Sequence, residues 1–333
     1  MLPVLAMTLL FTLCQGVDSS GPAASAGTRA RSAAEDDRFG IRLLEAPVKR
    51  RGDPRALYQI VDHLAPGTTI HRRVQVTNLS AKALHFQMGA TAAGIDRSRF
   101  TVAAANTASE LTSWISFDRD SFEVPAYGNA PVKVTIKVPP DASKGERYAV
   151  IWAQVAAPAN DVRNVGVNTQ VGIRVYLDIG PGGEPPSDFR IEKLIPARAK
   201  EGQAEVSAMV HNTGGRALDM SGSFTLSDGP GGLRAGPYPA TLGTTLAPGD
   251  RAPVVVRLDE RLPNGPWEVR LSLSSGLIKR TVTATLTFPA AGGTGPPVEV
   301  RSNGVLHGAL LAGVPAVAVL LLLLVRRRRS GRG

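Results

Sequence analysis

Apolar and polar residues alternate with a period of two over much of the chain. Residues 132–138 place valine or isoleucine at every second position, with threonine and lysine between them. The segments 204–210, 267–273 and 281–288 repeat the pattern. One apolar side with this period is typical of antiparallel strands that pack one face on a core. No segment before residue 305 shows helical periodicity over three turns. We therefore predict an all-β chain of sandwich type.

The strand pattern occurs twice. VQVTNLSAKAL at 74–84 and SAMVHNTGGRAL at 207–218 each place an asparagine at a strand end, Asn78 and Asn212. Such a repeat predicts two domains of one architecture. We expect two tandem Ig-like β-sandwich modules, at residues 39–178 and 188–289. A Gly/Pro-rich linker at 179–187 joins them, and a spacer at 290–304 follows.

The end of the chain reads as a membrane anchor. Residues 305–325 form 21 consecutive uncharged residues. As a helix they would span about 30 Å, one bilayer core. Arg326, Arg327, Arg328 and Arg329 follow, and such a block stays on the cytoplasmic side. We predict a single-pass cell-membrane protein with a transmembrane helix at 305–325, a cytoplasmic tail at 326–333 and both modules outside the cell.

The beginning of the chain reads as a signal peptide at residues 1–26. A short apolar run at 2–13 precedes Ala24-Ser25-Ala26, an A-x-A type of cleavage site, although no Lys or Arg precedes the run. The single cysteine, Cys14, lies in this segment. The bulky Leu13 before it disfavours a lipoprotein anchor. An exported chain left without cysteine is more typical of bacterial surface proteins than of eukaryotic ectodomains.

Net charge gives a weak indication of the partner. The formal charge is +10, and five arginines of the tail account for half of it. The remaining excess of about +5 forms no basic and aromatic cluster of the kind that reads nucleic acid, so we expect no nucleic-acid partner. A mild positive balance favours anionic wall polymers or lipid headgroups.

The sequence contains no catalytic or metal-binding motif. Its histidines form no HxH or HExxH pair, and no cysteine remains to complete a zinc site. Asp118-Arg119-Asp120 reads as a charged turn rather than a calcium loop. We predict no enzymatic activity, no metal and no cofactor.

Aromatic residues are the remaining candidates for ligand binding. Trp267 lies on the inward face of an alternating strand, and Trp152 lies in YAVIWAQV, a strand that is apolar on both faces and is expected to be central. Both are predicted to be core residues. Trp114 follows a polar connection, where it either stacks on a sugar ring or closes the end of a sandwich. Tyr58 and Tyr127 lie near turns and carry the same ambiguity.

Three segments resemble a known family. They are residues 39–78, the stretch from Trp114 through FDRDSFEVPAYG, and VPPDASKGERYAVIWAQV at 138–155. With the strand Ile41–Leu44, the turn Pro66-Gly67, and Ala142, Gly145 and Tyr148, they resemble the N-terminal module of WxL-interacting cell-surface proteins of Gram-positive bacteria. The resemblance covers roughly residues 39–178. It implies a first module that binds peptidoglycan, a second Ig-like module that binds a protein, and a C-terminal anchor.

These observations favour a membrane-anchored bacterial surface protein that binds peptidoglycan or another wall polymer, a wall-associated protein, or both. The alternative is a membrane-tethered assembly factor or chaperone for a secreted surface protein, which offers an edge strand to its partner. A cell-wall hydrolase is a third hypothesis.

Overall fold

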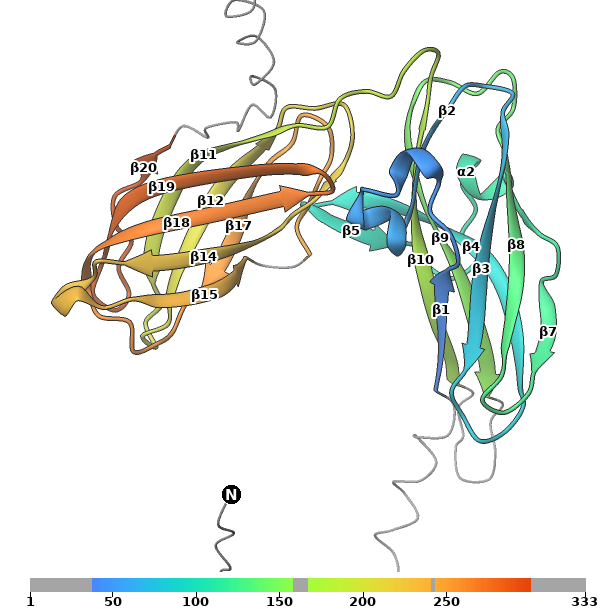
Figure 1. Ribbon diagram of the computed structural model, residues 1–333, viewed down its shortest axis with the longest axis horizontal. Helices are drawn as coiled ribbons and strands as arrows, with labels where there is room; N and C mark the ends of the chain where they lie inside the picture. Colours follow the sequence, from blue (N-terminus) through green and yellow to red (C-terminus); the bar gives the residue numbers. More distant parts are fainter. Residues whose placement is uncertain (1–37, 158–166, 241–242, 301–333) are drawn as a thin grey trace, which may run out of the picture.

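The computed structural model describes residues 38–157, 167–240 and 243–300, and within these β-strands joined by turns and loops make up the fold, with only short helical turns besides. Two β-sandwiches lie at an angle to each other, with strands β1–β10 in one and β11–β20 in the other (Figure 1). The all-β prediction is thus confirmed. The predicted signal peptide, transmembrane helix and arginine tail lie outside the described residues. Within those residues, no helix is long and apolar enough to cross a membrane.

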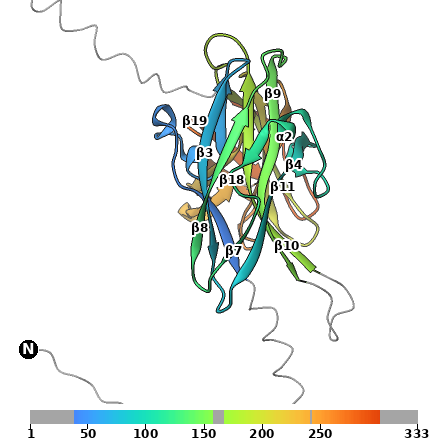
Figure 2. The same cartoon turned by 90° about the vertical axis from the view of Figure 1, so that its right-hand side faces the viewer.

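The first module packs a four-stranded sheet against a six-stranded sheet. Figure 2 views this module, whose long strands β3 and β8 pair side by side. Three short helices complete it: η1 (Val48–Arg50), η2 (Pro54–Leu57) and α2 (Glu110–Ser113). In sheet order, the smaller sheet contains β1 (Phe39–Leu43), β3 (Thr69–Asn78), β8 (Asn129–Lys137) and β6 (Ile115–Phe117). The larger contains β2 (Ile60–Leu64), β10 (Val167–Ile179), β9 (Gly145–Ala157), β4 (Leu84–Asp96) and β5 (Arg99–Val102), with β7 (Ser121–Val124) beside β4.

The second module packs two four-stranded sheets face to face, with a small two-stranded sheet at one end. The first contains β17 (Arg251–Arg257), β12 (Ala204–Asn212), β11 (Phe189–Arg198) and β20 (Val298–Glu299). The second contains β15 (Ala235–Ala240), β14 (Ser221–Ser227), β18 (Gly265–Ser275) and β19 (Ile278–Phe288). The small sheet pairs β13 (Leu218–Asp219) with β16 (Thr245–Leu246), and η3 (Pro230–Gly232) follows β14. Because β20 pairs with β11, part of the predicted spacer at 290–304 belongs to this sandwich.

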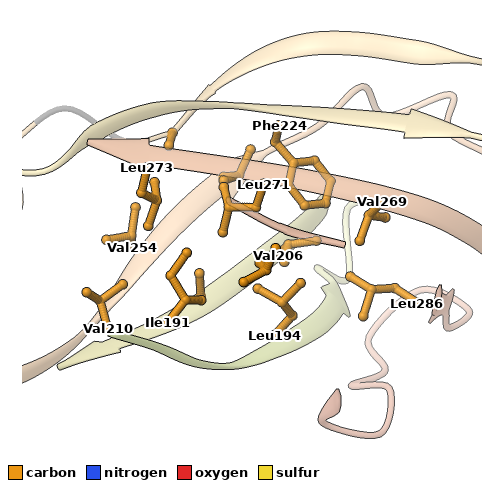
Figure 3. Packing of buried hydrophobic residues seen from close by; sticks show 14 of the residues in the cluster. Ile191, Leu194, Val206, Val210, Phe224, Val254, Val269, Leu271, Leu273 and Leu286 are labelled. Carbon is orange, nitrogen blue, oxygen red and sulfur yellow. The ribbon is translucent and has the colours of Figure 1, made fainter. Parts of the chain in front are cut away.

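Each module has its own apolar core. In the second, side chains from both sheets interdigitate, as Figure 3 shows for Val206, Phe224 and Leu271. The predicted alternation holds: Val132, Val134 and Ile136 of β8 are fully buried. Trp152 and Trp267 are buried as predicted, at 6% and 1% exposure. Burial of this kind stabilises a fold by roughly 25 cal/mol per Å² of apolar surface.

The repeated asparagines form matching corners. Asn78 is buried, and its side-chain amide donates to the carbonyls of Lys82, Val124 and Pro125. Asn212 is equally buried and donates to those of Arg216, Leu246 and Ala247. Each Oδ1 also accepts the backbone N–H two residues on, from Ser80 or Gly214. We call these the Asn78 corner (residues 78–84 and 124–128) and the Asn212 corner (residues 212–218 and 246–250).

Candidate functional site

The modules meet through two carboxylates, one on each side of the junction. Glu146, at the start of β9, accepts hydrogen bonds from Arg216 Nε at 2.8 Å and from the Ala217 backbone N–H at 2.7 Å. Arg216 belongs to the Asn212 corner, is 2% exposed, and also pairs with Glu184 of the linker. Glu184 in turn pairs with Arg50 of η1. The linker carboxylate therefore bridges both modules.

Asp219 of the second module is the reciprocal acceptor. Its donors are Gln59 Nε2 at 3.1 Å, Arg174 at 3.5 Å, the Tyr176 hydroxyl at 3.0 Å and the Thr245 hydroxyl at 2.7 Å. Burial, followed by the charge of Asp219, raises the pKa of Tyr176 above its usual range. Tyr176 is therefore protonated at neutral pH and remains a donor. Charged groups that satisfy one another in this way hold two bodies in one orientation.

An aromatic cluster lies beside these charges. The rings of Phe100, Tyr148 and Tyr176 have centroids 5.3–6.3 Å apart. The guanidinium of Arg174 lies 4.5 Å above the Phe100 ring. Ala217 of the Asn212 corner packs on this cluster from the second module. The junction thus combines buried apolar contact with paired charges, a combination that favours a fixed angle between the modules.

A groove of about 480 Å³ opens at this junction. Its walls come from β1, the end of η2, β10 and the β13–β14 region, and Asp219 also lines it. Leu57 and Tyr58 lie at its rim and are 64% and 57% exposed. Partial desolvation of the Tyr58 hydroxyl, followed by the nearby Asp219 carboxylate, raises the pKa of this side chain. Adjacent exposed apolar side chains at the rim of a groove make this region the candidate binding surface.

One wall of the groove is an open sheet edge. β2 runs parallel to β10 but pairs only with its last residues, Val175–Ile179. Upstream of Val175, no strand in the described part of the chain pairs with β10 on that side. The N–H of Gly180 donates to Leu64 of β2 at 3.1 Å. Because alternate residues direct their backbone groups to the same edge, Gln170 and Gly172 present their N–H and C=O there.

The predicted ligand-binding residues lie in three separate places. Tyr58 lines the junction groove, whereas Tyr127 belongs to the Asn78 corner and is 72% exposed. Trp114 ends helix α2 and packs in the core of the first module at 7% exposure. The guanidinium of Arg147 lies 5.1 Å from its ring centre. The burial of Trp114 favours the interpretation that it closes the sandwich, and leaves little surface for a sugar ring.

The predicted charged turn at Asp118–Asp120 is an exposed connection between β6 and β7. His71 and His85 are also exposed. Among the described residues, no group of three histidine, cysteine or carboxylate side chains could hold a metal. The open β10 edge and the Asp219 acceptor were not predicted. The alternation of apolar and polar residues over 167–179 indicates a strand, but it does not show which edge of that strand stays unpaired in the sheet.

Comparison with known proteins identifies no family. No protein-family model matches the sequence, and no curated protein is significantly similar to it. Solved structures with a similar arrangement include the class 5 fimbriae chaperone CfaA. That match has 11% identity, covers 76% of this chain and 99% of that chain, and has a TM-score of 0.37. The Salmonella enterica SafA pilin–SafB chaperone complex matches at 12% identity, over 79% and 97% of the two chains, with a TM-score of 0.38. At such values the likeness carries no argument about what this chain binds.

Proposed function

We propose that this protein is a non-enzymatic surface protein that holds an extended segment of a secreted or wall-associated protein in the junction groove. The observation that carries the proposal is the open edge of β10, which forms one wall of the groove beside Leu57 and Tyr58. An extended segment can add to such an edge through backbone hydrogen bonds, and nearby side chains then set its specificity.

The groove also limits the segment. A strand added beside Gln170 and Gly172 would meet the start of β2 at Ile60, which occupies the edge from Val175 onward. The outer neighbours of the added strand would be Ile41 and Arg42 of β1, which line the same groove. The site therefore suits one short segment that ends at the junction, and not a long strand that runs past it.

A photoreactive phenylalanine derivative in place of Tyr58 tests the proposal in cells that produce the full chain. We expect a cross-link to one protein partner. Gln170→Pro should abolish it, because proline removes the outward N–H and places a ring on the open edge. Gln170→Ala keeps that N–H and is the matched control. Cross-links that carry only glycan, or that persist in Gln170→Pro, would argue against strand addition.

A second function, retention of wall polymer, is favoured by Tyr127. Its φ is +54°, a conformation that costs a bulky residue energy. In the Asn212 corner the matching position is Gly249, with φ +82°. An exposed, strained tyrosine where glycine would suffice is consistent with a ring kept for stacking on a sugar.

Retention of purified peptidoglycan sacculi tests the second function. Tyr127→Phe keeps the ring and should leave retention unchanged, whereas Tyr127→Gly should weaken it by about 1 kcal/mol, the value of one aromatic stack. Equal retention by both variants would remove Tyr127 from the site. Anchoring by residues 305–325 is part of the same proposal: protease added to wall-stripped cells should degrade both modules, and their protection would contradict it.

A further inference from the structure

A second cavity, of about 680 Å³, lies between the modules beside the β4–β5 hairpin. From the first module it is lined by the hairpin residues Arg97, Ser98 and Arg99. From the second it is lined by parts of β12, β15 and β17, including Arg257 and Glu205. It adjoins the junction groove at Thr244, which lines both, but its lining includes neither the exposed Leu57 and Tyr58 nor the β10 edge on which the proposed protein-binding site depends.

The hairpin that forms one wall is held close to its tip. Ile95 and Phe100 are a cross-strand pair near the turn, where Phe100 belongs to the aromatic cluster of the junction and Ile95 packs against the same cluster. In the turn itself, the backbone N–H of Thr245 donates to the Ser98 carbonyl at 2.9 Å. These contacts hold the hairpin tip across the junction, where its residues form one wall of the cavity.

The tip has an uncommon conformation. Arg97 and Ser98 have φ of +46° and +58° between the paired residues Asp96 and Arg99. A two-residue turn with both φ positive is normally Asn-Gly or Asp-Gly, because other residues pay a steric cost there. Here an arginine occupies the first position and a second arginine follows the turn. The strained turn thus carries basic side chains to the cavity wall.

The three arginines of the cavity lack strong acidic partners. Within the described residues, no carboxylate forms an ion pair with Arg99 or Arg257. Arg97 has only its exposed neighbour Asp96, at 3.9 Å. Glu205 is the one acidic residue among those lining the cavity, which leaves an excess of positive charge. Guanidinium groups with free donors bind phosphate oxygens well, often through two parallel hydrogen bonds.

We propose that this cavity binds phosphate groups. The remaining wall disfavours an acidic peptide, because Pro239 and Pro253 have no N–H to offer an extended backbone. Ser98 and Thr244 add hydroxyl groups to the arginines. The phosphate could belong to a soluble polymer or to a lipid headgroup, since both present the same oxygens.

The test compares three probes with the full chain: inorganic polyphosphate, vesicles containing phosphatidylglycerol, and polyglutamate. We expect binding to polyphosphate, to the vesicles, or to both, and the arm that binds identifies the source of the phosphate. Polyglutamate should bind much more weakly. Polyglutamate binding as strong as that of the best phosphate probe would overturn the proposal, as would no binding to either phosphate probe.

Two triple variants locate the site. Arg97→Gln, Arg99→Gln and Arg257→Gln together should weaken binding roughly tenfold for each charged hydrogen bond lost. The control combines Arg119→Gln, Arg190→Gln and Arg261→Gln, which lie on the exposed surface away from this cavity and change the net charge equally. Equal weakening by both triples would overturn the proposal. Should the cavity variant unfold, modification of wild-type arginines by phenylglyoxal decides instead: the phosphate probe must protect the three cavity arginines, and their unchanged modification rejects the site.

Discussion

The Asn78 and Asn212 corners share one hydrogen-bond scheme but present different side chains. In each, a buried asparagine amide at the end of one strand bonds both its own loop and the turn before the neighbouring strand of the same sheet, β8 in the first module and β17 in the second. Four residues beyond the asparagine, the first corner has Lys82 and the second has Arg216. In the turn, the first has Tyr127 where the second has Gly249. The hydrogen bonds of the asparagine are the same in both corners, whereas the side chains that the corners present differ.

The comparison separates the residues that stabilise a corner from those that determine what the corner contacts. Arg216 turns the second corner into the surface that docks on the first module through Glu146. The first corner instead points outward and exposes Leu79 and Tyr127, at 50% and 72%. One repeated element therefore serves as an internal joint in one module and as a free surface in the other.

Removing the shared asparagines should have the largest effect. Asn78→Ala and Asn212→Ala each remove at least four hydrogen bonds of a buried side chain, at a net cost of about 0.5–1.5 kcal/mol for each bond. The carbonyls of Pro125 and Ala247 keep the backbone donors Gly128 and Asp250. We expect similar losses in the free energy of unfolding of the full chain, measured with urea. Asn129→Ala, at an exposed asparagine, should change stability by less than about 0.5 kcal/mol. Clearly unequal losses for the two corners would break the comparison.

Arg216→Ala should weaken the contact between the modules while leaving the hydrogen bonds of the Asn212 corner in place. It leaves Glu146, with a side chain 5% exposed, without its charged partner, at a cost of about 3–5 kcal/mol. Because the Asn212 amide bonds the backbone carbonyl of residue 216, the corner itself should survive. Small-angle scattering should then show a wider distribution of inter-module angles. Lys82→Ala is the matched control in the first corner, and an unchanged scattering profile for Arg216→Ala would refute a rigid joint.

Trp114→Ala compares the buried tryptophans of the two modules. Loss of a buried tryptophan costs about 3–5 kcal/mol, so Trp114→Ala and Trp267→Ala should lower stability by similar amounts. The folded Trp114→Ala protein should retain sacculi as well as the wild type. Weaker retention at an unchanged melting midpoint would restore Trp114 as a sugar-binding residue.

Exchange of the turn residues should have the smallest effect. Tyr127→Gly relieves a positive φ and should stabilise the first module by about 0.5–1 kcal/mol, after allowance for the entropy of glycine. Gly249→Tyr imposes the same strain on the second and should cost about 1–2 kcal/mol. Urea unfolding of each variant beside the wild type measures both changes in the free energy of unfolding. Effects of the same sign would show that the two turns are not equivalent.

Sequence predicted what depends on local pattern. Alternation in 132–138 and 267–273 located β8 and β18, and the repeated asparagines pointed to corners that the structure shows in detail. Trp114 was ambiguous because its burial depends on the packing of α2 against β4 and β9 and on Arg147, not on the polar residues that precede it. The groove and the arginine cavity could not be predicted either, because each is lined by residues that are far apart in the sequence. Tyr58 and Gly172 line the groove, and Arg99 and Arg257 line the cavity.

The open β10 edge also has a mechanical consequence. β10 leads directly into the linker, where Glu184 is bound to both modules. A partner strand on this edge would lie along β10, with its hydrogen bonds across the direction of the chain. A force that pulls the partner away from the second module would act along the strands. It would therefore strain all the backbone hydrogen bonds between the partner and β10 at once, and would not break them one after another. A contact of this geometry would resist being pulled apart even where its equilibrium affinity is weak.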